Sequence, residues 1–277
     1  MSNSMRLHYP DVDCSGKNIT DEILADIINK LDSTAVEILD LKKNKITTFD
    51  ANIFVNFTKL QKLHLDGNSL TIIVPPIKNI PNLTYLDLSF NQIKTLKNGT
   101  FNGLNKLTHL YLRGNDIETV DSGVFDDFMN LEDLFLIDNK IIRLLSGTFT
   151  GFGFRNTRVF LHYNKLTTDS IQKDVFGVPI LNLLGNNLTT IRKEWFASFP
   201  EMLVFAENPM VCDCALWGTI RSFNPFFLQN PCSSSFFYTN SMNCSPCIEH
   251  DCQNDAPCQV VDKFNYNCSC SEKHYGK

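Results

Sequence analysis

The chain has 277 residues, a net charge of −5 and ten cysteines. The negative net charge gives no electrostatic reason to bind nucleic acid or an anionic membrane surface. No apolar run reaches the roughly 18–20 residues of a transmembrane helix.

Residues 1–34 contain one cysteine, Cys14, in the segment DVDCSGKNIT. The opening stretch MSNSMRLHYPDVDC lacks the apolar core of a secretory signal peptide, so no signal peptide is predicted here. The other nine cysteines all lie after residue 210. This grouping is typical of disulfide-stabilised segments in an oxidising compartment.

Residues 35–208 repeat one pattern about eight times. The form L-x-L-x-x-N-x-(L/I) occurs as LDLKKNKI, LHLDGNSL, LDLSFNQI, LYLRGNDI and LFLIDNKI, and weaker copies follow as VFLHYNKL, LNLLGNNL and LVFAENPM. In this period and consensus the chain resembles the extracellular leucine-rich-repeat family over about four fifths of its length. The resemblance implies an α/β-type solenoid, a curved horseshoe with a parallel β-sheet on its concave face.

The leucines and the asparagine of the pattern have separate roles. Alternate leucines such as Leu110 and Leu112 are expected to line one continuous core, because a single repeat cannot bury its apolar side alone. The asparagine follows the strand, where its amide can pair with backbone groups left inside the turn. These asparagines are therefore predicted to be structural and not ligand contacts: Asn44, Asn68, Asn91, Asn115, Asn139, Asn164, Asn186 and Asn208.

Phenylalanines recur in the return path of the repeats, which resembles the phenylalanine spine of secreted leucine-rich-repeat proteins. Core packing is the favoured interpretation over a stacking platform for a cofactor or nucleic acid, and no cofactor is predicted. The expected spine pairs are Phe54/Phe57, Phe101/Leu104, Phe125/Phe128, Phe149/Phe152 and Phe196/Phe199, with Ile77/Ile80 in the repeat that lacks phenylalanine.

Residues that alternate with the core leucines are predicted to face outward from the sheet. Large aromatics beside arginine are enriched at protein-interface hot spots, and solenoids use extended concave faces for partners. The alternative is ordinary strand composition, since Tyr and Phe favour strands. Four aromatics are expected to form a row, each in the same slot of successive repeats: Tyr85, Tyr111, Phe135 and Phe160. The predicted ligand-binding set adds His109, Arg113, Asp133, Arg158, His162 and Tyr163.

No metal site and no catalytic site are predicted. His109 and His162 lie two repeats apart, roughly 10 Å at sheet spacing, which is too far to share a metal ion. Outward aspartates such as Asp66 and Asp87 are ordinary at strand edges. The motifs of serine hydrolases, zinc proteases and phosphate-binding loops do not occur. The chain is therefore predicted not to be an enzyme.

Residues 209–246 resemble the cysteine-rich C-terminal cap of the family, beginning at NPMVCDCALW. The resemblance implies the bridges Cys212–Cys232 and Cys214–Cys244, with Trp217 and Ile220 covering the open end of the core. The gaps between Cys214, Cys232 and Cys244 are short for this cap. A zinc site is the rival, but the absence of a second tight C-x-x-C favours disulfides.

The two ends of the chain also carry resemblances. DVDCSGKNIT resembles the end of the family's N-terminal cap, so residues 1–34 are interpreted as its remnant and Cys14 is expected to lack a partner. Residues 247–277 resemble a truncated epidermal-growth-factor-like (EGF-like) module. That module implies Cys247–Cys258 and Cys252–Cys268, leaves Cys270 unpaired, and suggests a fragment cut at both ends. Calcium is not expected, because Asn243 to Pro246 contain no acidic residue and Val261 occupies the loop position.

Five good glycosylation sequons agree with secretion. None of them falls on an outward strand position, where a glycan would block the concave sheet. The predicted acceptors are Asn18, Asn56, Asn82, Asn98 and Asn187.

Together these features predict an extracellular protein–protein recognition module that binds a protein ligand on its concave face. The order of parts resembles Slit-type guidance proteins and leucine-rich-repeat adhesion receptors, so a receptor ectodomain or a secreted signalling, guidance or adhesion protein is expected. The alternatives are a structural matrix component or a pattern-recognition immune receptor. The expected partner is an extracellular or cell-surface protein, without nucleic acid and without membrane insertion by this segment.

Overall fold

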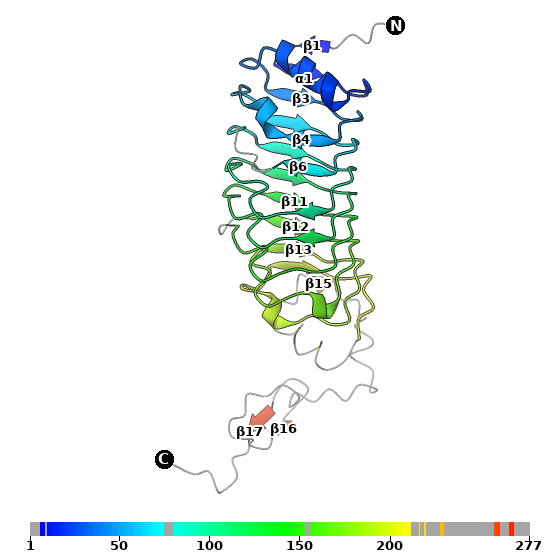
Figure 1. The fold of residues 1–277 in the computed structure, drawn as a ribbon. Helices are drawn as coiled ribbons and strands as arrows, with labels where there is room; N and C mark the ends of the chain where they lie inside the picture. The colour runs from blue at the N-terminus through cyan, green and yellow to red at the C-terminus, as the bar shows by residue number, and fades with distance from the viewer. Residues whose placement is uncertain are drawn as a thin grey trace.

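The computed structural model describes residues 6–8, 10–74, 80–152 and 156–211, together with Leu216, Thr219 and residues 228–229, 258–260 and 266–268. Successive coils of the chain stack along one axis, from α1 (Asp21–Lys30) near the N-terminal end to β15 (Leu228–Gln229) (Figure 1). The repeat pattern thus forms a solenoid, as predicted.

One sheet of eleven strands runs the length of the solenoid. All neighbours pair in parallel except the first two, which are antiparallel. The register places equivalent repeat positions opposite one another, for example Leu86 beside Leu110. Between β1 and β15 the order is β2 (Asp11–Asp13), β3 (Ile38–Asp40), β5 (Lys62–His64), β7 (Tyr85–Asp87), β9 (His109–Tyr111), β11 (Asp133–Phe135), β12 (Arg158–Phe160), β13 (Ile180–Asn182) and β14 (Met202–Val204), with β1 at Arg6–His8.

The return paths consist of turns, short strands and 3-10 helices, and α1 precedes the first repeat. The strands pair in parallel as β4 with β6 and β8 with β10. A separate antiparallel pair is formed by β16 and β17. The bounds are β4 (Thr48–Asp50), β6 (Ile72–Val74), β8 (Thr95–Leu96), β10 (Thr119–Val120), β16 (Cys258–Val260), β17 (Tyr266–Cys268), η1 (Ala51–Phe54), η2 (Thr168–Ser170) and η3 (Lys193–Trp195).

Most of the predicted C-terminal cap and EGF-like module lies outside the described residues, apart from Leu216, Thr219 and strands β15, β16 and β17. None of the four predicted disulfides is tested, because at least one partner of each is not described. The covering role of Trp217 and Ile220 is also outside the described residues and stays a prediction. Leu216, the residue before Trp217, is fully buried in the same core as the repeats.

The alternating leucines form one continuous core, as expected. Leu110 and Leu112 are completely buried, while His109 and Tyr111 between and beside them are half-buried on the other face of the sheet. The same burial pattern recurs from strand to strand, and the buried residues form a single cluster that runs from Val12 to Leu216.

The asparagines form a hydrogen-bonded ladder between repeats. Asn115 Oδ1 accepts from the Ile93 N–H of the preceding repeat (3.1 Å), and its Nδ2 donates to the carbonyls of Leu88 (3.0 Å) and Leu112 (3.1 Å). The other seven asparagines make equivalent bonds. Each amide therefore satisfies buried backbone groups in its own repeat and in the one before it.

The ladder closes at its C-terminal end within the last repeat. Asn208 Oδ1 accepts from the Leu188 N–H at 2.9 Å. The Met210 N–H lies two residues after Asn208, where the next repeat's asparagine would be needed, and it donates instead to the Asn208 carbonyl at 2.8 Å. The Met210 N–H is therefore hydrogen-bonded within the last described repeat, without an asparagine from a following repeat.

The N-terminal segment continues the repeat geometry further than the sequence indicated. Strand β2 pairs in parallel with β3, and the Cys14 N–H donates to the Asp40 carbonyl (2.8 Å) as Leu41 N–H does to the His64 carbonyl. Cys14 therefore occupies the position of a strand leucine. It is a free, fully buried thiol, and burial raises its pKa to about 11.

The phenylalanine spine differs from the predicted one at two residues. Phe176 belongs to the spine but was not predicted, and Phe199 was predicted but is not buried. Phe176, absent from the predicted set, is fully buried between Phe149 and Phe196, with ring centroids 5.8 Å from each. Phe199 was expected inside, but it is 48% exposed. Ile77 lies outside the described residues, whereas its predicted partner Ile80 is fully buried.

The residue before each ladder asparagine has a left-handed backbone, which glycine adopts without strain. Gly114 (φ +65) fills this slot before Asn115, and a Cβ there would lie 2.7 Å from the ring of Phe90. Phe90 itself occupies the same slot one repeat earlier, with φ +54. An exposed aromatic therefore stands where the turn favours glycine.

Candidate functional site: the concave face

Four aromatic rings of the sheet contact one another in sequence across successive repeats. Centroids are 5.0 Å apart for Tyr85 and Tyr111, 4.6 Å for Tyr111 and Phe135, and 4.6 Å for Phe135 and Phe160. The rings of the last two pairs are stacked nearly parallel, with interplanar angles of 10° and 4°, whereas Tyr85 and Tyr111 are tilted by 38°. We call Tyr85, Tyr111, Phe135 and Phe160 the concave aromatic row; all four are half-buried.

The prediction that all four share one slot is wrong for Tyr85. Tyr111, Phe135 and Phe160 lie directly opposite one another, but Tyr85 pairs with His109, and Asp87 occupies the slot opposite Tyr111. The Tyr85 ring reaches Tyr111 diagonally, as long aromatic side chains on a sheet can. Burial raises the pKa of both tyrosines, so their hydroxyls stay protonated at neutral pH.

Asp133 was predicted as an outward ligand contact, and the structure contradicts this. The residue is only 3% exposed, because Arg158 covers it with two bonds: Nε to Oδ1 at 2.5 Å and NH2 to Oδ2 at 2.6 Å. His109 Nε2 approaches the same carboxylate at 3.5 Å. Asp133 therefore orients Arg158 and is not accessible to a partner, and this ion pair raises the pKa of Arg158.

The remaining predicted residues lie near the ends of the strands. Arg113 is exposed, bonds Asp138 (Nε to Oδ2, 3.1 Å) and lies over the Phe90 ring, 5.6 Å from its centroid. Tyr163 is exposed in the left-handed slot, and its hydroxyl donates to Glu207 Oε2 at 3.3 Å. His162 is half-buried beside Tyr163, with ring centroids 5.5 Å apart.

Burial lowers the pKa of His162, while Asp138 raises it and Arg113 lowers it more weakly. Among the described residues, its buried Nδ1 has no hydrogen-bond partner. Because the folded chain lowers this pKa, the unfolded chain binds a proton on the His162 imidazole more readily. The contribution of neutral His162 to stability is therefore complete above the ordinary pKa near 6.5 and is lost as pH falls below it.

We expect acid destabilisation between pH 7.5 and 5 to be smaller in His162→Gln than in wild type, as measured by urea unfolding. Parallel pH profiles would contradict this.

A recess of about 280 Å³ opens at the C-terminal ends of β5, β7, β9 and β11. Phe90, Tyr111 and Phe135 supply aromatic walls, and Asp66 and Asp87 supply carboxylates. Sequence reasoning missed Phe90 as a surface residue, although it is 56% exposed. Three repeats place glycine at this position (Gly67, Gly114 and Gly185), and four others carry Lys43, Asp138, Tyr163 and Glu207, so an aliphatic-free, turn-type position could be recognised from the sequence.

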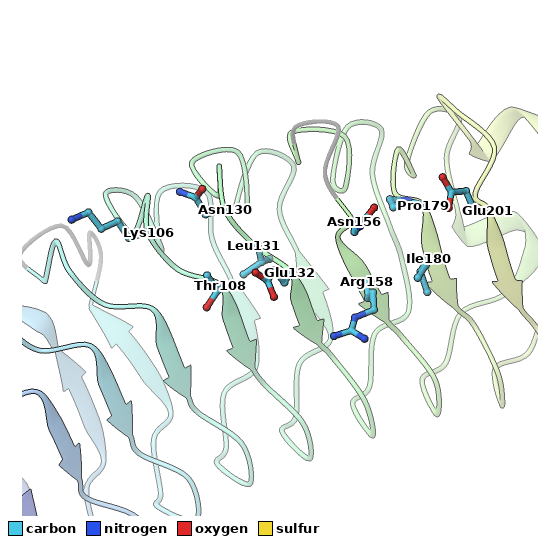
Figure 2. A pocket seen from close by; sticks show the side chains of 10 residues that line it. All are labelled: Lys106, Thr108, Asn130, Leu131, Glu132, Asn156, Arg158, Pro179, Ile180 and Glu201. Carbon is cyan, nitrogen blue, oxygen red and sulfur yellow. The ribbon is translucent and has the colours of Figure 1, made fainter. Parts of the chain in front are cut away.

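A larger recess of about 890 Å³ lies across the beginnings of the strands β9 to β14. Figure 2 shows that its side chains come from successive repeats, with Lys106, Glu132 and Arg158 among them and Glu201 at the far end. Both signs of charge are present, so the recess suits a polar protein surface better than a simple anion. Arg158 joins this recess to the concave aromatic row through strand β12.

One group of possible metal ligands occurs in the described part of the chain. His64, Asp66 and Asp87 offer one ligand atom each, and these atoms lie within 4.8 Å of one another. Among the histidines, sequence reasoning considered only His109 and His162 as a metal-binding pair, and the structure places them two strands apart. It did not consider that the register sets His64 directly beside Asp87.

The predicted glycan acceptors differ in accessibility. Asn18, Asn56, Asn98 and Asn187 are exposed. Asn82 is half-buried, and its amide donates to the Thr58 carbonyl and accepts from Lys106 Nζ, both at 2.6 Å. The exposed four remain predicted acceptors, and Asn82 is the least favourable of the set.

Comparisons with known proteins agree on the fold. A family model described as "Leucine rich repeat" matches residues 31–70 and 77–117. The mouse RP105/MD-1 complex is similar at a TM-score of 0.56 and 24% identity, over 70% of this chain and 34% of that one. The LRIM1/APL1C complex is similar at 0.51 and 23%, over 65% and 32%. The chain thus spans about a third of each structure's length.

Among curated proteins, none matches the chain by sequence. No helix in the described residues has the length and apolar character required to cross a membrane.

Proposed function

We propose that this leucine-rich-repeat protein is an extracellular protein–protein recognition module that binds a protein partner on its concave face. The observation that carries the proposal is the concave aromatic row, a half-exposed stack of four rings held on a rigid ladder. Rigid aromatic surface contributes binding energy at low ordering cost. The fold neighbours were solved as protein complexes, LRIM1 with APL1C and RP105 with MD-1, which supports the same class of function.

Arg158 gives the row a charged end. Its guanidinium is held by Asp133 yet remains 46% exposed, so it needs little reorganisation to bond a partner. Tyr and Arg are the residue types that dominate interface hot spots. The aromatic row, Arg158 and the adjoining mixed-charge recess (Figure 2) make one surface with an apolar centre and a polar rim.

Phe90 provides independent support. A non-glycine residue in the left-handed region costs about 1–2 kcal/mol, and this one exposes its ring instead of burying it. Other repeats carry Lys43, Asp138, Tyr163 and Glu207 in this slot, so the exposed ring of Phe90, and not its backbone, supports a binding role. Phe90 also walls the recess beside Tyr111 and Phe135, so its exposed ring extends the concave aromatic row toward solvent.

The test is a binding screen of the secreted chain against a panel of extracellular and cell-surface proteins. Phe90→Gly should keep or raise the free energy of unfolding, because relief of left-handed strain offsets the roughly 0.5–1 kcal/mol entropy cost of glycine. The same variant should weaken binding by about 30-fold, as loss of a hot-spot residue does. Met129→Ala is the matched control, since Met129 is equally exposed at 59% but lies on the return path.

A quadruple alanine variant of the concave aromatic row should lose the partner entirely while remaining folded by circular dichroism. Partners that bind wild type, Phe90→Gly and the quadruple variant equally would overturn the concave-face proposal. The aromatic stack would then be ordinary strand packing.

The extracellular assignment rests on the sequons and on the cysteine-rich C-terminal segment. Expression through a secretory pathway, followed by glycan removal, tests acceptor use at Asn18, Asn56, Asn98 and Asn187. Catalysis is not proposed, because leucine-rich-repeat folds typically serve as interaction scaffolds. A structural matrix component or a pattern-recognition immune receptor is the alternative assignment, favoured if binding proves diffuse or directed at non-protein ligands.

A further inference from the structure

We propose that His64, Asp66 and Asp87 form a binding site for a divalent transition metal ion, with Zn²⁺ as the preferred ion. His64 and Asp66 project at the end of β5, and Asp87 ends β7 in direct register with His64. The three ligand atoms lie within 4.8 Å of one another, and all three residues are half-buried. Modest side-chain rotation brings such atoms to the roughly 2.0–2.2 Å bonds of zinc.

The ion pairs on the concave face distinguish the carboxylates of Asp66 and Asp87 from the other aspartates there. Asp40, Asp133 and Asp138 each have a basic partner, in Lys42, Arg158 and Arg113 respectively. Within the described residues, neither Asp66 nor Asp87 takes part in an ion pair. The nearby Lys42 ammonium is bonded to Asp40 at 2.7 Å. Two adjacent half-buried carboxylates therefore lie beside an imidazole without a Lys or Arg paired to them in the described residues, and a divalent ion would neutralise them.

The donor set selects the class of ion. One imidazole nitrogen with two carboxylate oxygens suits zinc and its neighbours, whereas calcium and magnesium prefer oxygen ligands alone. Three protein ligands leave a coordination position for water. Asp66 and Asp87 also line the 280 Å³ recess, so the ion would be reached from solvent through that opening.

The surroundings hold the ligands in place. Asp87 Oδ1 accepts from the Ser89 N–H at 2.9 Å, and the Tyr85 hydroxyl hydrogen-bonds to the same carboxylate, so both neighbours orient it. The His64 ring packs against Tyr85 with centroids 4.9 Å apart. Supporting contacts of this kind fix ligand orientation in metal sites. The proposal does not depend on the recognition function, since the ion would bind with or without a protein partner.

The test is equilibrium dialysis of the full chain against Zn²⁺ after alkylation of free thiols. His64→Gln and Asp87→Asn, on different strands, should each weaken zinc binding by about 100-fold or more. Asp87→Asn keeps an oxygen for the Ser89 N–H and so preserves the turn. Asp40→Asn is the matched control, because Asp40 occupies the same slot as Asp87 two strands earlier, in β3, and is paired with Lys42. This variant should bind zinc as wild type does.

Cobalt substitution separates this site from the cysteines. Co²⁺ at His64, Asp66 and Asp87 should show ligand-field bands without thiolate charge-transfer absorption, and both site variants should lose those bands. Equal zinc stoichiometry and affinity in wild type, His64→Gln, Asp87→Asn and Asp40→Asn would overturn the proposal. A cobalt spectrum of thiolate type alone, unchanged in the variants, would do the same.

Discussion

Asn115→Leu is expected to lower the free energy of unfolding by about 3 kcal/mol or more. The substitution removes the acceptor for the Ile93 N–H and the donors to the Leu88 and Leu112 carbonyls, all of them buried. Each buried group left unpaired costs about 1–3 kcal/mol, and leucine offers no polar replacement. Urea unfolding measures the loss, and hydrogen exchange of the Ile93 amide localises it, since that N–H should exchange faster.

Asn208→Leu is the matched control at the end of the ladder. Asn208 makes the same kinds of bonds, to the Leu188 N–H and the Leu183 and Phe205 carbonyls, but it is only half-buried. Water can replace part of its bonding, so its loss should cost less than that of Asn115. An unfolding midpoint in Asn115→Leu equal to that of wild type would contradict the structural role of the ladder.

Phe176→Ala is expected to cost about 3–5 kcal/mol, the usual range for removing a buried phenylalanine. Its ring lies between Phe149 and Phe196 in adjacent repeats, so truncation leaves a cavity that bridges two coils. The neighbouring backbone is tied by the Phe176 N–H bond to the Trp195 carbonyl (2.9 Å), which limits collapse into that cavity. Thermal or urea unfolding of the variant measures the effect.

Phe199→Ala provides the comparison for that experiment. Phe199 has the same residue type and lies on the same side of the solenoid, but it is 48% exposed. Its removal should change stability by about 0.5 kcal/mol, as is typical of surface positions. Equal losses in the two variants would mean that the spine is not the structural element that the ring stack indicates.

The sequence predicted the repeat fold well because the repeat period and the residue types both follow from what each coil needs in order to fold. Leu110, Leu112 and Asn115 recur together because each coil must bury one face and satisfy one turn. Phe176 escaped the prediction because its repeat has Pro179 where the second phenylalanine of the pair was sought. Phe199 was wrongly assigned to the spine because it has the spacing of a spine residue near the last described coil. Its side chain is nevertheless half-exposed.

The candidate site was predicted less completely, because it depends on register and on side-chain direction. Spacing alone suggested that Tyr85 shares the slot of Tyr111, but the pairing sets it beside His109. Outward position alone suggested an accessible Asp133, but Arg158 folds over it. Phe90 was overlooked because the left-handed slot before each asparagine lies outside the strand alternation.

The asparagine ladder also constrains how such a chain can change over generations. Every ladder asparagine reaches backward to the preceding coil with the same set of bonds, and Asn44 bonds the Cys14 carbonyl as Asn68 bonds that of Leu41. At the other end, the Met210 N–H bonds a local carbonyl instead. Duplication or loss of one whole repeat by in-register recombination therefore recreates the same bonds at the new junction. A gene of this kind can lengthen or shorten its binding face in steps of one coil without needing a new set of ladder bonds.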